Sequence, residues 1–181
     1  MFDERETVSS VRNGDMRAFE LLIKQYERLV FSIISRLVDH GNDTEDIAQE
    51  VFIKIYNGLE RFAFQSKLST WVASITYHTA LNYIRDHKKH TTSGAAGMQD
   101  GMYFTTETPA RLSEQKEINR YVHQLIGEMP VAYKTVLTLY HLHEMSYEEI
   151  GKITGMPEGT VKNYLFRARK ILKEQLKKCL E

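Results

Sequence analysis

Apolar side chains recur at steps of three and four residues along most of this 181-residue chain, and no other feature constrains the fold as strongly. The clearest run extends from Phe19 to Leu37, where the apolar residues fall on one face of a helix. No stretch of useful length alternates as a half-buried strand would. We therefore expect an all-α protein, whose other helices cover approximately residues 46–59, 70–89, 113–126, 131–143, 147–153 and 157–172.

One segment interrupts this pattern. Three glycines and small polar residues dominate residues 90–101, and no apolar periodicity returns before Pro109. This composition is typical of a flexible linker, and a structureless loop of this length is uncommon inside one compact domain. We expect two small helical domains, residues 1–90 and 113–181, joined by a flexible linker over residues 91–112.

The compartment follows from the chain's apolar runs, its N-terminal charges and its cysteine content. No apolar run approaches the ~18 residues that span a bilayer, and residues 1–6 are acidic where a signal peptide is basic and then apolar. The one cysteine, Cys179, excludes an internal disulfide and a cysteine-based zinc site within one chain. We expect a cytoplasmic protein without membrane insertion.

The formal net charge is zero, because 24 Lys and Arg balance 24 Asp and Glu, but the two signs are sorted along the chain. Five acids and no base lie between Asp39 and Glu50, whereas seven bases and one acid lie between Gly159 and Lys178. Runs of like charge are usually solvated faces. Opposite signs in different parts of the chain also fit two surfaces that bind different partners.

The segment that follows Met145 has the pattern of a helix-turn-helix. Ser146 and Glu149 have the spacing of a capping box, in which each side chain bonds to the backbone N–H of the other residue. Gly155 and Pro157 then turn the chain into a second, basic helix. Two helices joined in this way favour a DNA-binding motif, and a structural hairpin with a solvated basic face is the alternative.

The first half of that second helix is the part that enters a major groove. The amide of Asn163 can read a base edge, while Lys162 and Arg167 can contact phosphates or guanine. The DNA contacts expected on this helix are Glu158, Thr160, Lys162, Asn163, Phe166 and Arg167.

Six stretches, which together cover much of the chain, carry a resemblance to a known family. They are Asp43–Tyr56, Lys67–Asp86, Met129–Leu142, Met145–Gly151, Gly155–Lys162 and Arg167–Arg169. The first two resemble region two, and the other four region four, of the bacterial RNA polymerase sigma factors of the extracytoplasmic-function (ECF) type. The helix-turn-helix alone is shared with many regulators, but its combination with the acidic stretch is specific. The resemblance implies a factor that binds core RNA polymerase and directs it to promoters.

In this family the exposed face of the acidic helix docks on the polymerase. An acidic strip suits a basic protein surface and would repel DNA. Ordinary solvated acids are the alternative interpretation. The resemblance places the polymerase contacts at Asp46, Gln49, Glu50 and Lys54.

In the same family region two captures the −10 element as single-stranded DNA, and region four reads the −35 element as a duplex. Capture of unstacked bases needs aromatic surfaces and cations. Trp71 suits the core as well as DNA, and this chain has Tyr77 and His78 where many relatives have an Arg-Asn pair. The region-two contacts implied are Phe62, Phe64, Ser66, Lys67, Trp71, Tyr77, His78, Asn82, Arg85, Lys88 and Lys89.

Two other classes of protein compete with a sigma factor. A stand-alone helix-turn-helix regulator would explain residues 129–178 but not the acidic helix or the aromatic loop. An enzyme lacks support, because no nucleophile motif or phosphate loop is present, and His141 and His143 would point about 200° apart on a helix. We expect no catalysis, cofactor or metal. The resemblance adds an anti-sigma factor as a candidate partner.

Overall fold

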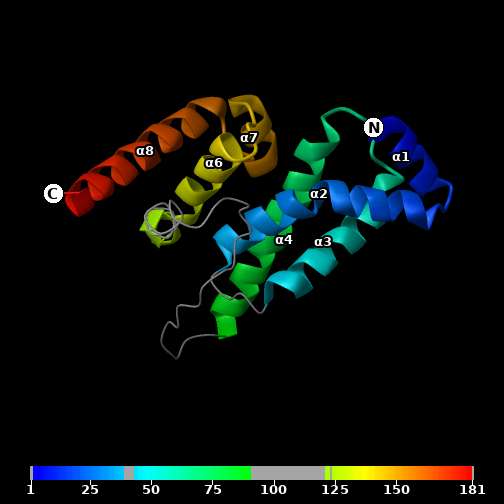
Figure 1. Ribbon diagram of the computed structural model, residues 1–181, viewed down its shortest axis with the longest axis horizontal. Coiled ribbons are helices and arrows are strands. Elements are labelled where there is room, and N and C mark those ends of the chain that lie inside the picture. Colours follow the sequence, from blue (N-terminus) through cyan, green and yellow to red (C-terminus); the bar gives the residue numbers. More distant parts are fainter. Residues whose placement is uncertain (1, 39–42, 91–120, 123, 181) are drawn as a thin grey trace, which may run out of the picture.

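Every regular element that the structure describes is an α-helix, so the all-α expectation is confirmed. The computed structural model (Figure 1) describes residues 2–38, 43–90, 121–122 and 124–180. The expected linker and most of the expected 113–126 helix lie outside these ranges, although 121–122 and 124–127 are helical. The helices are α1 (Glu4–Arg12), α2 (Met16–Leu37), α3 (Thr44–Leu59), α4 (Leu68–His90), α6 (Val131–His141), α7 (Tyr147–Thr154) and α8 (Glu158–Leu180).

Helix α1 was not expected from the sequence. Asp3 caps it, since its carboxylate accepts a hydrogen bond from the backbone N–H of Glu6 at 2.9 Å. Only two large apolar residues, Val8 and Val11, face the core, and two residues are too few to establish a helical period. The Tyr26 hydroxyl donates to the Glu4 carboxylate at 2.8 Å and fixes α1 on α2.

Helix α2 is the central element of the N-terminal half. Asp15 caps its first turn, and the apolar face predicted from Phe19 to Leu37 is buried, apart from the half-buried Ile23. This face packs against α1, α3 and α4. Figure 1 shows these four helices together in one part of the molecule, with the N-terminus beside α1.

Two features of α3 and α4 differ from what local spacing and cap preference predict. The apolar spacing of α3 places Tyr56 on its inward face, but Tyr56 is 39% exposed, because it lies on the rim and contacts Phe19 edge to face. Ser69 and Thr70 are residue types that can cap a helix, but α4 already begins at Leu68. The Thr70 hydroxyl is therefore not used as a cap and instead bonds to Glu149 in the other half of the chain.

The helix-turn-helix is confirmed as α7 and α8, and both hydrogen bonds of the capping box between Ser146 and Glu149 are present. Gly155 ends α7 with a φ of 74°, a conformation that glycine adopts without strain. A glycine at position 151 of this helix could admit a neighbouring helix, but its missing Cβ instead makes room for the carbonyl oxygen of Met156 in the turn. Helix α6 ends at His141, two residues earlier than expected.

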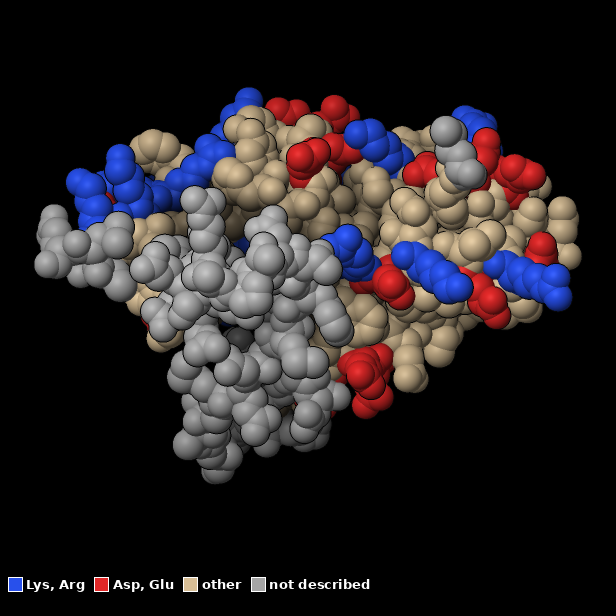
Figure 2. All heavy atoms as spheres, viewed as in Figure 1, with Lys and Arg blue, Asp and Glu red and all other residues tan. Residues whose placement is uncertain are grey.

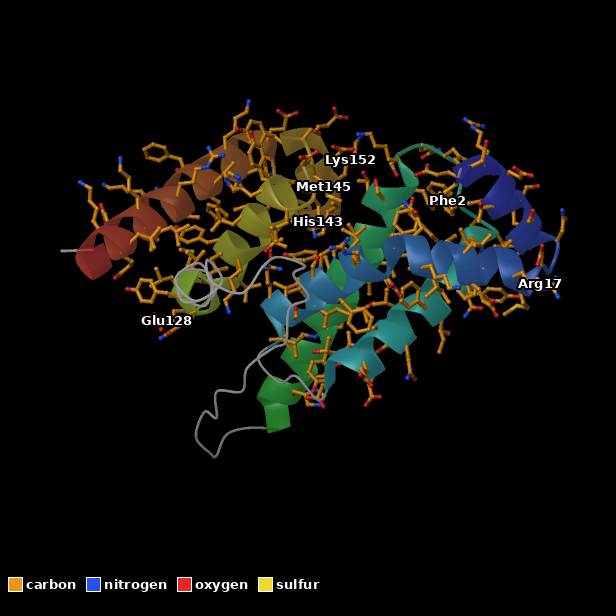
Figure 3. The ribbon with its side chains drawn as sticks, viewed as in Figure 1. Phe2, Arg17, Glu128, His143, Met145 and Lys152 are labelled. Atoms are coloured by element: carbon orange, nitrogen blue, oxygen red, sulfur yellow. The ribbon has the colours of Figure 1, made fainter. Side chains whose placement is uncertain are left out.

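The two halves of the chain pack on each other. Helix α6 lies against α2, and α7 lies against α4 (Figure 1). Ile33 and Leu37 of α2 face Leu139 of α6 across a void of only about 10 Å³. The segment after α6 also reaches α2, because His143 and Ser32 are hydrogen-bonded at 2.6 Å; Figure 3 labels His143 at this junction. No helix within the described residues has the length and apolarity needed to cross a membrane.

Candidate functional site

The exposed face of α3 carries the acidic residues that the sequence predicted for polymerase docking. Asp46, Gln49 and Glu50 are all exposed, and their three- and four-residue spacing places them on one stripe of the helix. Ile53 continues that stripe and is 60% exposed. Sequence reasoning missed Ile53. The signal was available, because this apolar residue does not fall on the buried face that the spacing of the helix predicts.

Lys54 differs from the other three predicted docking residues because it reaches sideways to α4. Its Nζ pairs with the Glu50 carboxylate at 2.6 Å and donates to the Thr79 hydroxyl at 3.2 Å. Lys54 also lines a surface hollow of about 290 Å³ between α3 and α4, together with His78 and Asn82. The structure therefore groups Lys54 with the predicted DNA contacts of α4.

A second polar contact fixes the start of α3 on α4. The Tyr83 hydroxyl donates to the Asp43 carboxylate. Burial raises the pKa of Tyr83 to about 12, and the Asp43 carboxylate adds to the effect because it stabilises the protonated phenol. The phenol therefore remains a donor at any physiological pH.

The aromatic residues of the loop before α4 form one cluster. Phe62 is buried, with its ring centroid 4.7 Å from that of Phe64 and 4.9 Å from that of Trp71. The Arg5 guanidinium covers the Phe64 ring at 4.8 Å, and Arg12 donates to the backbone carbonyl groups of residues 59 and 62. Phe62 is thus a core residue, and Phe64 and Trp71 form the half-buried part of the cluster.

The predicted contacts along α4 divide into exposed and covered residues. His78, Asn82 and Arg85 are exposed, whereas Tyr77 is only 5% exposed. Burial raises the pKa of Tyr77, and the neighbouring Thr135 side chain of α6 partly offsets this by lowering it. In this arrangement Tyr77 therefore contacts the other half of the chain. The side chains of Lys88 and Lys89 lie outside the described residues.

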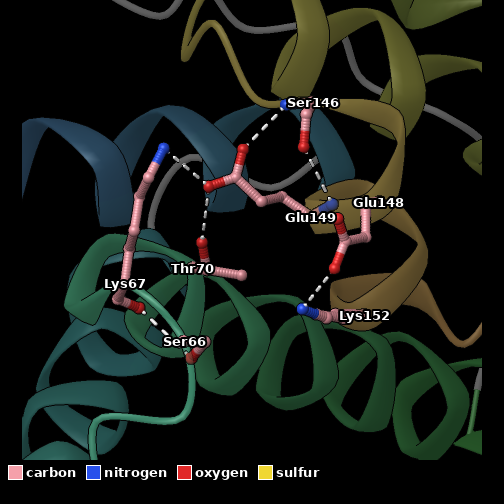
Figure 4. A network of polar contacts seen from close by, with 7 residues as sticks. All are labelled: Ser66, Lys67, Thr70, Ser146, Glu148, Glu149 and Lys152. Carbon is pink, nitrogen blue, oxygen red and sulfur yellow. Dashed lines mark hydrogen bonds and ion pairs between the residues drawn. The ribbon is translucent and has the colours of Figure 1, made fainter.

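The predicted loop contacts Ser66 and Lys67 lie where α4 meets α7 (Figure 4). Lys67 Nζ is 3.0 Å from the Glu149 carboxylate, which also accepts a hydrogen bond from the buried Thr70 at 3.2 Å. Burial raises the pKa of Glu149, but the backbone and side chain of Ser146 and the Lys67 ammonium outweigh it and lower the pKa to about 2. Glu149 is therefore ionised at neutral pH. The Ser66 hydroxyl donates to the Lys67 carbonyl at 3.3 Å.

The outer face of α8 carries the predicted duplex contacts. Figure 2 shows basic side chains gathered over this helix, whereas both signs are mixed over α1 and α2. Phe166 is 69% exposed although it is a large apolar residue. Asn163 and Arg167 are exposed beside it, Lys162 pairs with Glu158 at 3.7 Å, and Thr160 is half-buried.

A tyrosine pair supports the flank of this helix, and sequence reasoning missed it. The rings of Tyr140 and Tyr147 stack at 5.3 Å. Lys162 lies over Tyr147 at 5.3 Å, and Arg169 lies over Tyr140 at 5.1 Å. Such cation–π contacts hold basic side chains in place. The sequence did hold a signal for this pair, because α6 and α7 each contribute one tyrosine and both helices were expected to pack against α8.

His141 and His143, which were considered as a possible pair of metal ligands, have separate hydrogen-bond partners. His141 accepts a hydrogen bond from Arg169 Nε at 3.1 Å, whereas His143 bonds to Ser32 of α2. Burial lowers the pKa of His143 to about 4, and the charge of Arg36 adds to the effect. His143 is therefore neutral at pH 7 and contributes to the contact between the two halves.

Both halves of the chain match known protein families. Residues 22–90 match the family model of sigma-70 region 2, and residues 119–172 match that of sigma-70 region 4. The RNA polymerase sigma-H factor of Pseudomonas aeruginosa is 33% identical over 98% of this chain and 95% of its own. The ECF sigma-E factor of Escherichia coli is 34% identical over 91% of this chain and 90% of its own. The chain belongs to the ECF sigma factors.

A solved sigma factor structure shows the same fold. The sigma factor RpoE, in complex with the anti-sigma factor NepR from Bartonella quintana, aligns with a TM-score of 0.73 at 19% identity, over 88% of this chain and 96% of that chain. As a sigma factor, this protein directs promoter-specific initiation of transcription, and the helix-turn-helix motif belongs to its region four. The stand-alone regulator is not favoured, because the region 2 match over residues 22–90 covers the acidic helix and the aromatic loop, which such a regulator would not explain.

Proposed function

We propose that this sigma factor docks on core RNA polymerase through the exposed stripe of α3 and contacts promoter DNA through α4 and α8. The observation that carries the proposal is the separation of charge in the fold. The acids of α3 and the bases of α8 belong to different halves, so one surface favours a basic protein partner while the other favours phosphates. Ile53 adds an exposed apolar side chain to this stripe, and the core of a protein interface is more apolar than its rim.

For the −10 element, we infer that single-stranded DNA passes along the α3–α4 hollow and the aromatic loop. Lys54, His78 and Asn82 supply polar and cationic groups there, and Phe64 and Trp71 supply half-buried rings. Cations that follow the backbone and rings that stack on bases are the two means by which proteins hold single strands. Phe62 supports this surface from the core.

For the −35 element, we infer that α8 enters the major groove of the duplex. Asn163 and Arg167 are exposed on the first half of the helix, as base contacts require. The neighbouring Phe166 can contact a thymine methyl group. Lys162 and Arg169, held by the tyrosine pair, supply phosphate contacts that fix the register.

Docking is tested by charge reversal on α3. The double variant Asp46→Lys with Glu50→Lys replaces two exposed side chains, so its fold should be unchanged. We expect it to lose co-purification with core polymerase, because it presents positive charge to a basic partner. The matched control is Glu20→Lys with Glu27→Lys, which makes the same charge change on exposed positions of α2. Retained co-purification of the α3 variant, with the control equally active, would contradict the docking surface.

We further propose that the protein acts in the cytoplasm and has an anti-sigma factor as a regulatory partner. The cytoplasm is where polymerase and promoter DNA meet. The anti-sigma proposal is supported by the fold shared with the RpoE of Bartonella quintana, which was solved with an anti-sigma factor bound. Pull-down with the tagged full-length chain from its own cells tests it.

A further inference from the structure

We propose that α1 belongs to the single-strand surface of region two, because Arg12 positions the aromatic loop (residues 60–67) so that it presents the ring of Phe64 to the DNA. Arg12 is thus a positioning residue, which acts on the DNA through Phe64. The inference rests on the proposed function of the loop in capturing single-stranded DNA. The docking and DNA contacts proposed for this protein all lie outside α1. In Figure 1 the loop runs from the end of α3 past α1 to the start of α4.

Arg12 joins the end of α3 to the loop. Its Nε donates to the backbone carbonyl oxygen of Leu59, the last residue of α3, at 3.0 Å, and its Nη2 donates to the carbonyl oxygen of Phe62. A guanidinium carries its donors in a rigid, planar fork, so it holds the two carbonyl groups in one relative orientation. The carbonyl groups at the end of a helix also carry partial negative charge, which favours a cation there. Arg12 therefore fixes the direction in which the chain leaves α3.

Phe64, two residues after the carbonyl group that Arg12 holds, has a strained backbone. Its φ of 54° lies in the left-handed region, which glycine adopts freely but a bulky side chain disfavours. A residue keeps such a conformation only where its surroundings hold it. The Phe64 ring lies 4.7 Å from the buried ring of Phe62. The guanidinium groups of Arg5 and Arg12 lie over it at 4.8 and 6.0 Å, so α1 holds the ring from the other element.

The strain indicates that the ring itself is used. Glycine would adopt this backbone conformation without strain, so the shape of the loop gives no reason for a phenylalanine at position 64. Phe64 is only half-buried, and the arginine beside it, Arg5, is exposed. A partly open ring next to cations suits a single strand, whose bases stack on aromatic rings while its phosphates pair with positive charge. Phe64 is therefore the ring on which an unstacked base of the promoter stacks.

Four variants separate the ring, the positioning and the charge. Phe64→Gly removes the stacking surface and relieves the backbone, so region two should resist urea at least as well as in the parent. Arg12→Gln removes the guanidinium fork, whereas Arg12→Lys keeps the positive charge but loses the fork. The matched control is Arg17→Gln, which removes the same charge from an exposed position five residues further along the chain. All four leave the docking stripe of α3 unchanged and should still co-purify with core polymerase.

Single-strand binding is measured with the full-length protein in complex with core polymerase. The probe is a labelled non-template strand of about 12 nucleotides, taken from a promoter at which this complex starts transcription, and core polymerase alone gives the background. We expect binding roughly tenfold weaker with Phe64→Gly, roughly fivefold weaker with either Arg12 variant, and unchanged with Arg17→Gln. Full affinity of Phe64→Gly would overturn the proposal. Full affinity of Arg12→Lys, or an equal loss in Arg17→Gln, would show that only charge matters and would overturn the positioning role.

A double variant tests whether Arg12 acts through Phe64. Arg12→Gln should weaken binding roughly fivefold in the parent and have no effect in a Phe64→Gly background, because the group that it positions is then missing. A residue that contacts the DNA itself, or that only stabilises the fold, would cost the same in both backgrounds. Equal losses would therefore overturn the proposal.

Trp71 reports the geometry of the loop in the free protein, without DNA. It is the sole tryptophan of the sequence, and its ring lies 4.9 Å from that of Phe62. Both Arg12 variants should shift its emission to longer wavelength, because a looser cluster exposes the indole to water, and Arg17→Gln should not. Unchanged emission in the Arg12 variants would overturn the positioning role. Shifted emission together with a parent complex that binds the strand no better than core polymerase would instead refute the proposed function of the loop and leave Arg12 a structural role alone.

Discussion

Gly58 of α3 lies directly against the indole ring of Trp71 in α4. A Cβ at position 58 would be 2.9 Å from Cζ2 and 3.2 Å from Cη2 of that ring. The indole has little room to withdraw on the side of the core, because it also packs against the buried ring of Phe62. The glycine thus sets the distance between the helix that carries the docking stripe and the helix that carries the single-strand contacts.

This contact predicts the effect of Gly58→Ala. Glycine to alanine inside a helix normally stabilises it by about 1 kcal/mol, but here the clash with Trp71 should reverse the sign and destabilise region two by about 1–3 kcal/mol. Urea unfolding measures the change. The control is Gly159→Ala in α8, where a Cβ meets nothing within 4 Å; destabilisation of both variants alike would contradict the packing explanation.

The cap of α7 predicts a separate loss of stability. Ser146→Ala removes the side-chain acceptor for the backbone N–H of Glu149, which should cost about 1 kcal/mol. Ser35→Ala is the control, since that exposed hydroxyl donates to the backbone of its own helix at 3.4 Å. Thermal unfolding of both variants checks the difference, and equal melting temperatures would show that the capping box contributes nothing.

His143 predicts a pH dependence of the contact between the halves. Its pKa is lowered from 6.5 to about 4 in the folded chain, so the unfolded chain binds the proton first as pH falls. The free energy of unfolding should therefore be fully retained above pH 6.5 and decrease as pH falls from 6.5 toward 4. His143→Gln should lose that part of the slope. Identical pH profiles of the variant and the parent would exclude His143 as the titrating group.

Two arginines of α8 should separate DNA contact from stability. Arg167 is exposed, so Arg167→Ala should leave the free energy of unfolding unchanged and weaken promoter-dependent transcription, by about 1–3 kcal/mol if it reads a base. Arg169 covers Tyr140 and donates to His141, so Arg169→Ala should also destabilise region four. Unchanged transcription by Arg167→Ala over a range of salt concentrations would remove that residue from the DNA surface.

The sequence predicted what depends on local spacing. The apolar face of α2, the Ser146–Glu149 capping box and the turn at Gly155 all follow from residues within a few positions of each other. The sequence did not predict the second partner of Glu149, because Lys67 is distant along the chain and nothing local indicates it. The burial of Tyr77 could not be predicted either, because whether a helix face meets water or α6 depends on tertiary packing. Helix α1 was missed although Asp3 and Glu6 have cap spacing.

The most direct test of the account is to map transcript start sites made by core polymerase with and without the purified protein. We expect a new set of start sites that share two upstream elements at constant spacing, one read by each region, together with weak duplex binding by the protein alone. Strong sequence-specific duplex binding without polymerase, and no new start sites in its presence, would contradict the account.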